Sequence, residues 1–107
     1  MSSFIVVVMT AATREEAINI VRQLLREKLI ACANIVGSVN SLYWWKGKIE
    51  ESREFLVLMK TRENLFEKLA KKVKELHSYE VPEVIALPLI RGLPAYLDWL
   101  NACLKPA

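Results

Sequence analysis

Cysteine, histidine and glycine are all scarce in this sequence, and each shortage argues against a class of site. The two cysteines, Cys32 and Cys103, are too few for a disulfide-rich scaffold, so we expect free thiols in a reducing compartment. The single histidine, His77, and the lack of Cys-x-x-Cys or His-x-x-x-His spacing argue against a structural zinc site within one chain. Only 3 glycines are present, and none belongs to a phosphate-binding loop.

Long apolar runs and an excess of one charge are also missing. The longest fully apolar run, residues 4–9, is far shorter than the roughly 20 residues that span a bilayer, and Met1-Ser2-Ser3 is not a basic secretory start. We therefore expect a cytoplasmic protein without a membrane partner. The net charge of +3, from 15 basic and 12 acidic residues, is too balanced to indicate a nucleic-acid partner. No nucleophile elbow or catalytic triad pattern is present, so the sequence does not predict an enzyme.

What the sequence does contain is a regular alternation of strand and helix patterns, which predicts one domain over residues 1–107. Residues 4–9 have the continuous apolar pattern of a strand buried on both faces. Thr13 begins a Thr-x-x-Glu capping box, and apolar residues follow it at helical spacing for about four turns. Thr61 is expected to cap a second amphipathic helix.

A long hairpin and two shorter elements complete the pattern. The hairpin arms are expected at about 31–45 and 48–61, joined at Lys46-Gly47, and Pro88 places the strand at 84–90 on a sheet edge. A short helix ends the chain. The order βαββαβ plus a C-terminal helix is the ferredoxin-like α+β sandwich. Because residues 4–9 and 55–59 are continuously apolar, their strands should be central and the other two should be edges.

The hairpin and the high apolar content, 53% of the residues, predict a homo-oligomer. An arm of about 15 residues at roughly 3.3 Å each would be ~50 Å long, whereas a 100-residue domain has a radius of gyration of only ~13 Å. The arm must therefore bend or overhang, which exposes Tyr43, Trp44 and Trp45. Two helices also cover only one face of a sheet that is apolar on both faces. Other subunits would cover these surfaces.

Five segments carry a specific resemblance: LIACAN (29–34), SLYWWKGKI (41–49), KTR (60–62), YEVPE (79–83) and YLDW (96–99). Through them the chain resembles the CutA divalent-cation tolerance family over nearly its whole length. One departure is Ser78, where the family usually has proline. The resemblance implies a cytoplasmic homotrimer of ferredoxin-like subunits, assembled like the nitrogen-regulatory PII signalling proteins with a long interlocking hairpin. It also implies a role in tolerance of divalent metals, copper above all.

Cys32 and His77 are the candidate metal ligands, and each has a structural alternative. The soft thiolate of Cys32 would suit Cu(I), but free cysteine is also among the residues most often buried in cores. His77 would be a ligand or would simply complement the dipole at a helix end. No obligatory cofactor is expected. A copper or other divalent-cation site would need ligands that trimer symmetry supplies more than once.

A further group of residues is expected either to pack between subunits or to line a pocket there. Interface packing is the leading interpretation of its aromatic members. The alternative is an aromatic-walled pocket for a small anionic or metal-bound ligand. Two functions therefore stay open: a trimeric metal-tolerance protein that binds copper or another divalent ion, and a PII-like small-ligand sensor or scaffold linked to metals indirectly. The group comprises Tyr43, Trp45, Lys60, Tyr79, Glu80, Glu83, Tyr96 and Trp99.

Overall fold

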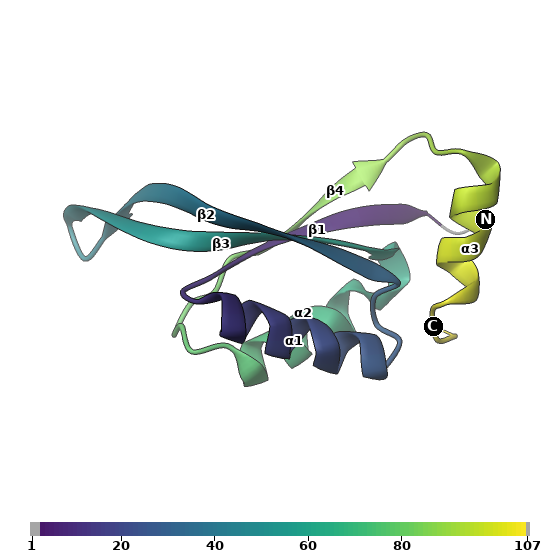
Figure 1. Ribbon diagram of the computed structural model, residues 1–107, viewed down its shortest axis with the longest axis horizontal. Coiled ribbons are helices and arrows are strands. Elements are labelled where there is room, and N and C mark those ends of the chain that lie inside the picture. Colours follow the sequence, from purple (N-terminus) through teal and green to yellow (C-terminus); the bar gives the residue numbers. More distant parts are fainter. Residues whose placement is uncertain (1–2, 107) are drawn as a thin grey trace.

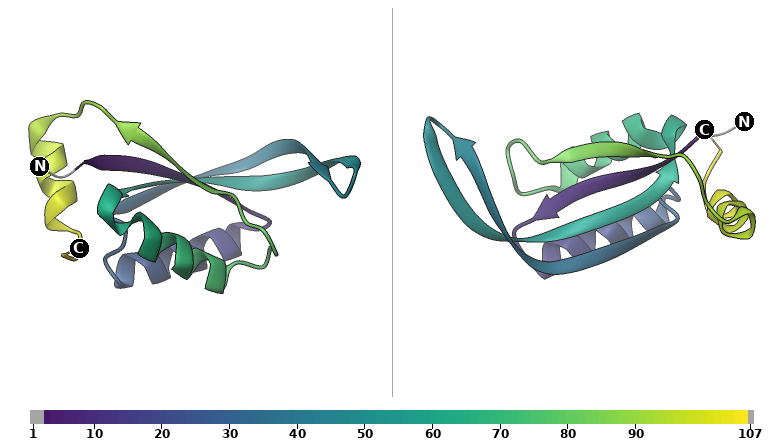
Figure 2. Two further views of the ribbon diagram at one scale, coloured as in Figure 1. Left: turned by 180° about the vertical axis from the view of Figure 1, so that it is seen from behind. Right: turned by 90° about the horizontal axis from the view of Figure 1, so that it is seen from above.

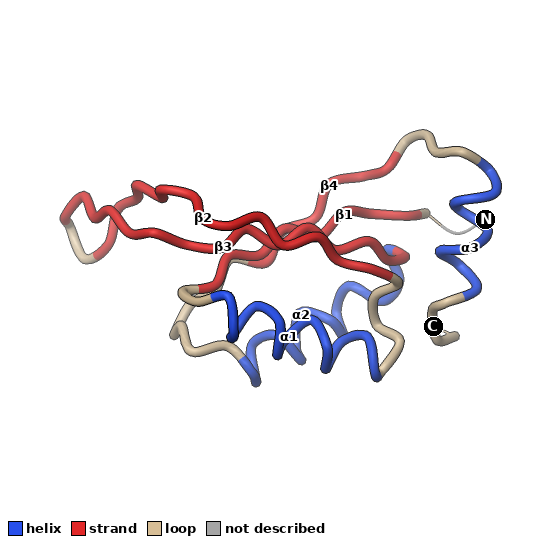
Figure 3. Tube along the Cα trace, in the orientation of Figure 1, coloured by secondary structure: helices blue, strands red, loops and turns tan. Residues whose placement is uncertain are grey.

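The computed structural model describes residues 3–106 and shows a four-stranded sheet with two helices on one face and a third helix at one end (Figure 1). Short loops join most of the elements (Figure 3). The order agrees with the predicted βαββαβ pattern plus a C-terminal helix. The elements are β1 (Phe4–Ala11), α1 (Arg14–Arg26), β2 (Cys32–Trp45), β3 (Lys48–Arg62), the 3-10 turn η1 (Glu63–Leu65), α2 (Phe66–Leu76), β4 (Val84–Leu89) and α3 (Pro94–Ala102).

The strands lie in the order β2-β3-β1-β4, and every neighbouring pair is antiparallel. The prediction that the two continuously apolar strands are central is therefore confirmed. Cross-strand partners point to the same face, and Val7 of β1 is opposite Met59 of β3. Both side chains are fully buried on the face that α1 and α2 cover. The proline-containing strand β4 is at an edge, as expected.

The core lies between this face of the sheet and the apolar stripes of the two helices. α1 contributes Ile20 and Leu24, and α2 contributes Leu69 and Val73, all fully buried. Their i, i+4 spacing places each pair on the same side of its helix. Each fully buried aliphatic side chain of this size contributes about 1.5–3 kcal/mol to stability relative to exposure.

The two predicted helix caps had different outcomes. The Thr13 hydroxyl accepts a hydrogen bond from the Glu16 N–H at 3.1 Å, so the first cap is confirmed. The prediction for Thr61 was wrong. Thr61 is the penultimate residue of β3, is fully buried, and its hydroxyl donates to the Leu29 carbonyl at 2.7 Å. The second helix instead begins through η1 and has no side-chain cap.

The β2–β3 hairpin extends well beyond the helices and bends along its length (Figure 2). Its pairing continues as far as Trp45 opposite Lys48, and the longest dimension of the molecule is 44 Å. At the tip, Lys46 and Gly47 both have positive φ, 50° and 78°, as a two-residue hairpin turn requires. A bulge between Gly37 and Val39 interrupts the register where the hairpin leaves the body of the sheet. The predicted overhang is present.

The face of the sheet opposite the helices is largely uncovered (Figure 1). Val36 of β2 and Ile85 and Leu87 of β4 are 45%, 54% and 54% exposed on this face. Within residues 3–106 no helix is both long enough and apolar enough to cross a membrane.

Candidate functional site

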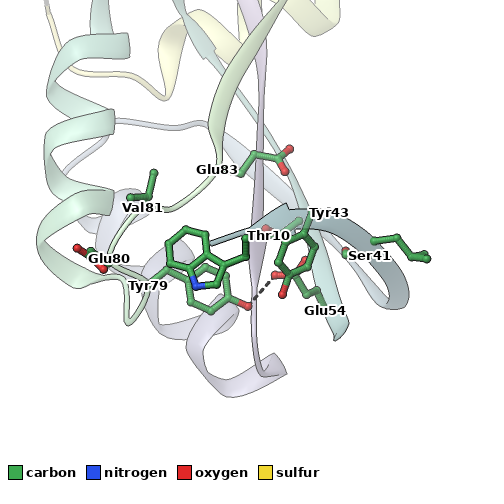
Figure 4. A pocket seen from close by; sticks show the side chains of 10 residues that line it. Thr10, Ser41, Tyr43, Glu54, Tyr79, Glu80, Val81 and Glu83 are labelled. Carbon is green, nitrogen blue, oxygen red and sulfur yellow. Dashed lines mark hydrogen bonds between the residues drawn. The ribbon is translucent and has the colours of Figure 1, made fainter. Parts of the chain in front are cut away.

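A cleft of about 570 Å³ lies where the hairpin leaves the sheet, beside the end of β1 and the loop after α2 (Figure 4). Five of the residues predicted for a pocket line it: Tyr43, Trp45, Tyr79, Glu80 and Glu83. The other five lining residues were not predicted from the sequence: Thr10, Ser41, Leu42, Glu54 and Val81.

Glu54 is the buried carboxylate among the residues that line this cleft, with 6% of its surface exposed. The Tyr79 hydroxyl donates to Glu54 Oε2 at 2.6 Å, and this bond is drawn in Figure 4. Burial together with this hydrogen bond to a carboxylate raises the pKa of Tyr79 far above its ordinary value. Tyr79 therefore remains a neutral hydrogen-bond donor. The neighbouring Tyr43 hydroxyl lies 3.1 Å from Ser52 Oγ.

His77 lies beneath this cleft with a fully buried side chain. Its Nε2 is 2.7 Å from the Thr10 carbonyl oxygen, which can only accept. Its Nδ1 is 3.1 Å from the Tyr79 backbone N–H, which can only donate. The neutral tautomer with the proton on Nε2 satisfies both contacts. Both ring nitrogens thus have protein partners, and a metal would have to displace one of them.

The loop after α2 is held in place by contacts with the two helices. The Ser78 N–H donates to Glu16 Oε2 at 2.8 Å, and Lys74 donates to the Glu80 carbonyl. Burial raises the pKa of Glu16, but the hydrogen bonds that its carboxylate accepts from Ser78 and from the Ala12 N–H outweigh this effect, so the pKa is lowered overall. Side-chain contacts from α1 and α2 therefore position Tyr79 at the cleft.

The other predicted site residues form a second cluster. Cys32 Sγ is 3.4 Å from the Tyr96 hydroxyl and 3.9 Å from Lys60 Nζ. Lys60 Nζ also donates to Asn34 Oδ1 at 3.1 Å, and the Tyr96 and Trp99 rings are 5.5 Å apart. The pKa of Tyr96 is raised, mainly by its hydrogen bond to Cys32 and to a smaller extent by burial. This cluster joins the start of β2 to α3.

The structure does not bring Cys32 and His77 together. Cys32 is opposite Lys60, which is opposite Val6, whereas His77 contacts Thr10 four residues further along β1. Four residues of strand span about 13 Å. Across residues 3–106 no three His, Cys, Asp or Glu side chains are grouped so that they could hold a metal ion. Cys32 and His77 therefore do not belong to one site within the described residues.

The family model described as "CutA1 divalent ion tolerance protein" matches residues 5–103. This chain belongs to the CutA family. The divalent-cation tolerance protein CutA of Thermus thermophilus is 46% identical over 96 residues, which cover 90% of this chain and 93% of that protein.

Solved CutA structures have the same fold as this chain. The Thermus thermophilus divalent cation tolerance protein has a TM-score of 0.92 and 43% identity, covering 98% of this chain and 100% of that one. CutA1 from Oryza sativa has a TM-score of 0.95 and 42% identity, covering 98% and 96%. The curated rice relative, "Protein CutA 1, chloroplastic", is 46% identical over 91% of this chain, which spans only 55% of that protein's length.

The names of the relatives place CutA proteins in different compartments. The rice protein is named chloroplastic, and a solved relative from Archaeoglobus fulgidus, 42% identical over 98% of this chain and 100% of that one with a TM-score of 0.90, is described as periplasmic. Membership of the CutA divalent ion tolerance family therefore does not fix the compartment of this chain.

Proposed function

We propose that this CutA-family protein is a cytoplasmic homotrimer that binds copper or another divalent metal ion at a site completed by a neighbouring subunit, and that it is not an enzyme. The uncovered apolar face of the sheet is the observation that supports the homotrimer. Val36, Ile85 and Leu87 are exposed there on three edge positions beside an overhanging aromatic hairpin. Exposed apolar surface of this extent is typical of subunit contacts. The two free cysteines favour a reducing compartment.

Light scattering on the full chain tests the assembly. We expect a particle of three times the 12.3 kDa chain mass at micromolar concentration. Leu87→Glu should dissociate it, because a charge would be buried on the sheet face. Leu25→Glu is the matched control, since Leu25 is an exposed leucine on the helical side. A stable wild-type monomer, or equal effects of the two substitutions, would refute the trimer proposal.

The metal part of the proposal rests on Cys32, which is partly accessible and carries the soft donor atom that Cu(I) prefers. One thiol cannot complete a copper site, so ligands from a second copy are required. We expect stoichiometric Cu(I) binding under reducing conditions that Cys32→Ala abolishes and that the matched variant Cys103→Ala retains. His77→Ala tests the second predicted ligand. If all variants bind alike, or the wild type does not bind in stoichiometric amounts, the direct metal role is wrong.

The second candidate is a PII-like small-ligand sensor or scaffold whose link to metals is indirect. It is favoured by the presence of a cleft large enough for a small molecule within one chain. The sequence-based prediction of an anionic ligand requires Lys60, which lies with Cys32 and Tyr96 rather than at this cleft. An anion site would therefore belong to the second cluster or to a subunit contact that includes it.

A further inference from the structure

We propose that the cleft beside the hairpin binds a small organic cation, an amine or quaternary ammonium group, between the rings of Tyr43 and Tyr79 and the carboxylate of Glu54. This inference goes beyond the proposed metal function, because it concerns a different site and none of the candidate copper ligands. It also differs from the small anionic or metal-bound ligand that was the alternative to interface packing in the sequence-based interpretation. Four observations support it: the charge of the lining, the size of the cleft, its aromatic walls and the position of Glu54.

The charge of the lining favours a cation. Glu54, Glu80 and Glu83 line the cleft, and no lysine, arginine or histidine is among the described residues that do so. The remaining lining residues are aromatic, aliphatic or hydroxyl-bearing. A concave surface with charges of one sign concentrates counter-ions of the opposite sign. An anionic ligand would find no cationic partner in this lining.

The size of the cleft and the spacing of its carboxylates argue against a bare metal ion. The three glutamates are not grouped closely enough to hold a metal, because no set of three ligating side chains among residues 3–106 meets that condition. The cleft volume of about 570 Å³ lies within the range of small-molecule sites, roughly 300–1,000 Å³. A cation whose charge is carried on a larger organic group fits both observations.

The aromatic walls of the cleft also favour a cation. Tyr43, Trp45 and Tyr79 come from the hairpin and from the loop after α2, so two separate segments contribute aromatic rings. The faces of such rings attract ammonium groups within about 6 Å of the ring centroid. Trp45 already makes such a contact within the chain, because Lys46 Nζ lies 5.8 Å from its ring centroid.

Glu54 provides a buried negative charge directed to the same place. Figure 4 shows its carboxylate beside the hydroxyl ends of Tyr43 and Tyr79. Glu54 Oε2 accepts from Tyr79, and no other hydrogen bond of this side chain occurs within residues 3–106. Its second oxygen therefore remains available to the cationic group, as an acceptor for an amine N–H or as the counter-charge of a quaternary ammonium group. Because the Tyr79 phenol stays protonated, it donates to this carboxylate and leaves the second oxygen to the ligand.

The proposal is tested by NMR titration of the ¹⁵N-labelled full chain with tetraethylammonium chloride at constant ionic strength, with sodium phosphate as the counter-probe. We expect saturable shifts of the Trp45 indole N–H with the cation and none with phosphate. Glu54→Gln, which keeps an acceptor for Tyr79, should weaken binding about tenfold, and Tyr43→Leu should weaken it about fivefold. The matched controls are Glu51→Gln, an exposed glutamate of the same strand, and Trp44→Leu, an exposed aromatic outside the lining.

Each control should change the affinity less than twofold. If the shifts do not saturate with the cation, the proposal is overturned. This holds also if the reason is that a neighbouring subunit fills the cleft. Saturable phosphate shifts at Trp45, or equal weakening by Glu51→Gln and Glu54→Gln, would also overturn it. If Glu54→Gln does not fold, the comparison of Tyr43→Leu with Trp44→Leu decides alone, since both side chains are exposed on the hairpin. The copper titration and the light-scattering test do not depend on these outcomes.

Discussion

Replacement of Gly37 by alanine should destabilise the protein by about 1–3 kcal/mol, the usual cost of forcing extra volume into a packed site. The Phe55 ring lies against Gly37 on the neighbouring strand, and a Cβ added to Gly37 would overlap the ring atoms. Phe55 packs against the core, so its ring cannot move away without disturbing core contacts. The cost therefore comes from steric overlap.

A double-mutant cycle with Phe55→Leu isolates this overlap. The combined variant should be less destabilised than the sum of the single variants by about 1 kcal/mol or more. Gly92→Ala is the matched control: its Cβ would lie 2.8 Å from Leu97 Cδ2, the end of a flexible side chain, so its cost should stay below about 1 kcal/mol. Urea unfolding at one fixed protein concentration measures all four variants, because assembly makes stability concentration-dependent. Equal effects at Gly37 and Gly92, or strict additivity with Phe55→Leu, would refute the reasoning.

Two further predictions concern stability. The lowered pKa of Glu16 means that its carboxylate stabilises the fold above its unfolded pKa of about 4.3 and that this contribution is lost as the pH falls through the folded value. Glu16→Gln should thus be about 1 kcal/mol less stable than the wild type at pH 7. In urea unfolding measured at a series of lower pH values, this difference should disappear. A difference that does not change with pH would contradict the prediction. Buried Arg62 donates to Asn64, Asn101 and the Lys105 carbonyl. Arg62→Met should therefore lower the free energy of unfolding by about 1.5–3 kcal/mol, whereas Arg91→Met, at an exposed arginine, should not. Equal thermal unfolding of the two variants would contradict this prediction.

The strand order was predictable because the apolar pattern of each strand indicates whether one or both of its faces are buried. A strand covered on both sides must be apolar at successive positions, and residues 4–9 and 55–59 meet that condition. The end of β3 was less predictable. Thr61 has the residue type of a helix cap, but it continues the alternation of buried Val57 and Met59, and this burial kept it in the strand.

The site was predictable in part. The aromatic residues Tyr43, Trp45 and Tyr79 were identified because they belong to segments that resemble a known family, and they line one cleft. Glu54 was not identified, because in sequence it resembles the nearby Glu50 and Glu51. Only strand register and the position of the loop carrying Tyr79 distinguish it.

The division of the predicted residues into two clusters was also not predictable from composition. Lys60 and Glu54 lie on the same strand, six residues apart, which corresponds to about 20 Å. One therefore belongs with Cys32 and Tyr96, and the other with Tyr79.

The bulge between Gly37 and Val39 decides which half of the hairpin's side chains faces Glu54. Because Ser38 is unmatched, Val39 is opposite Glu54, and odd-numbered residues such as Tyr43 and Trp45 lie on its side of the ribbon. If Ser38 instead paired with Glu54 in a regular register, even-numbered residues such as Trp44 would lie on that side, and Tyr43 and Trp45 would lie on the other. The one extra residue of β2 thus determines which aromatic side chains of the hairpin face the cleft, without any change in the strand order.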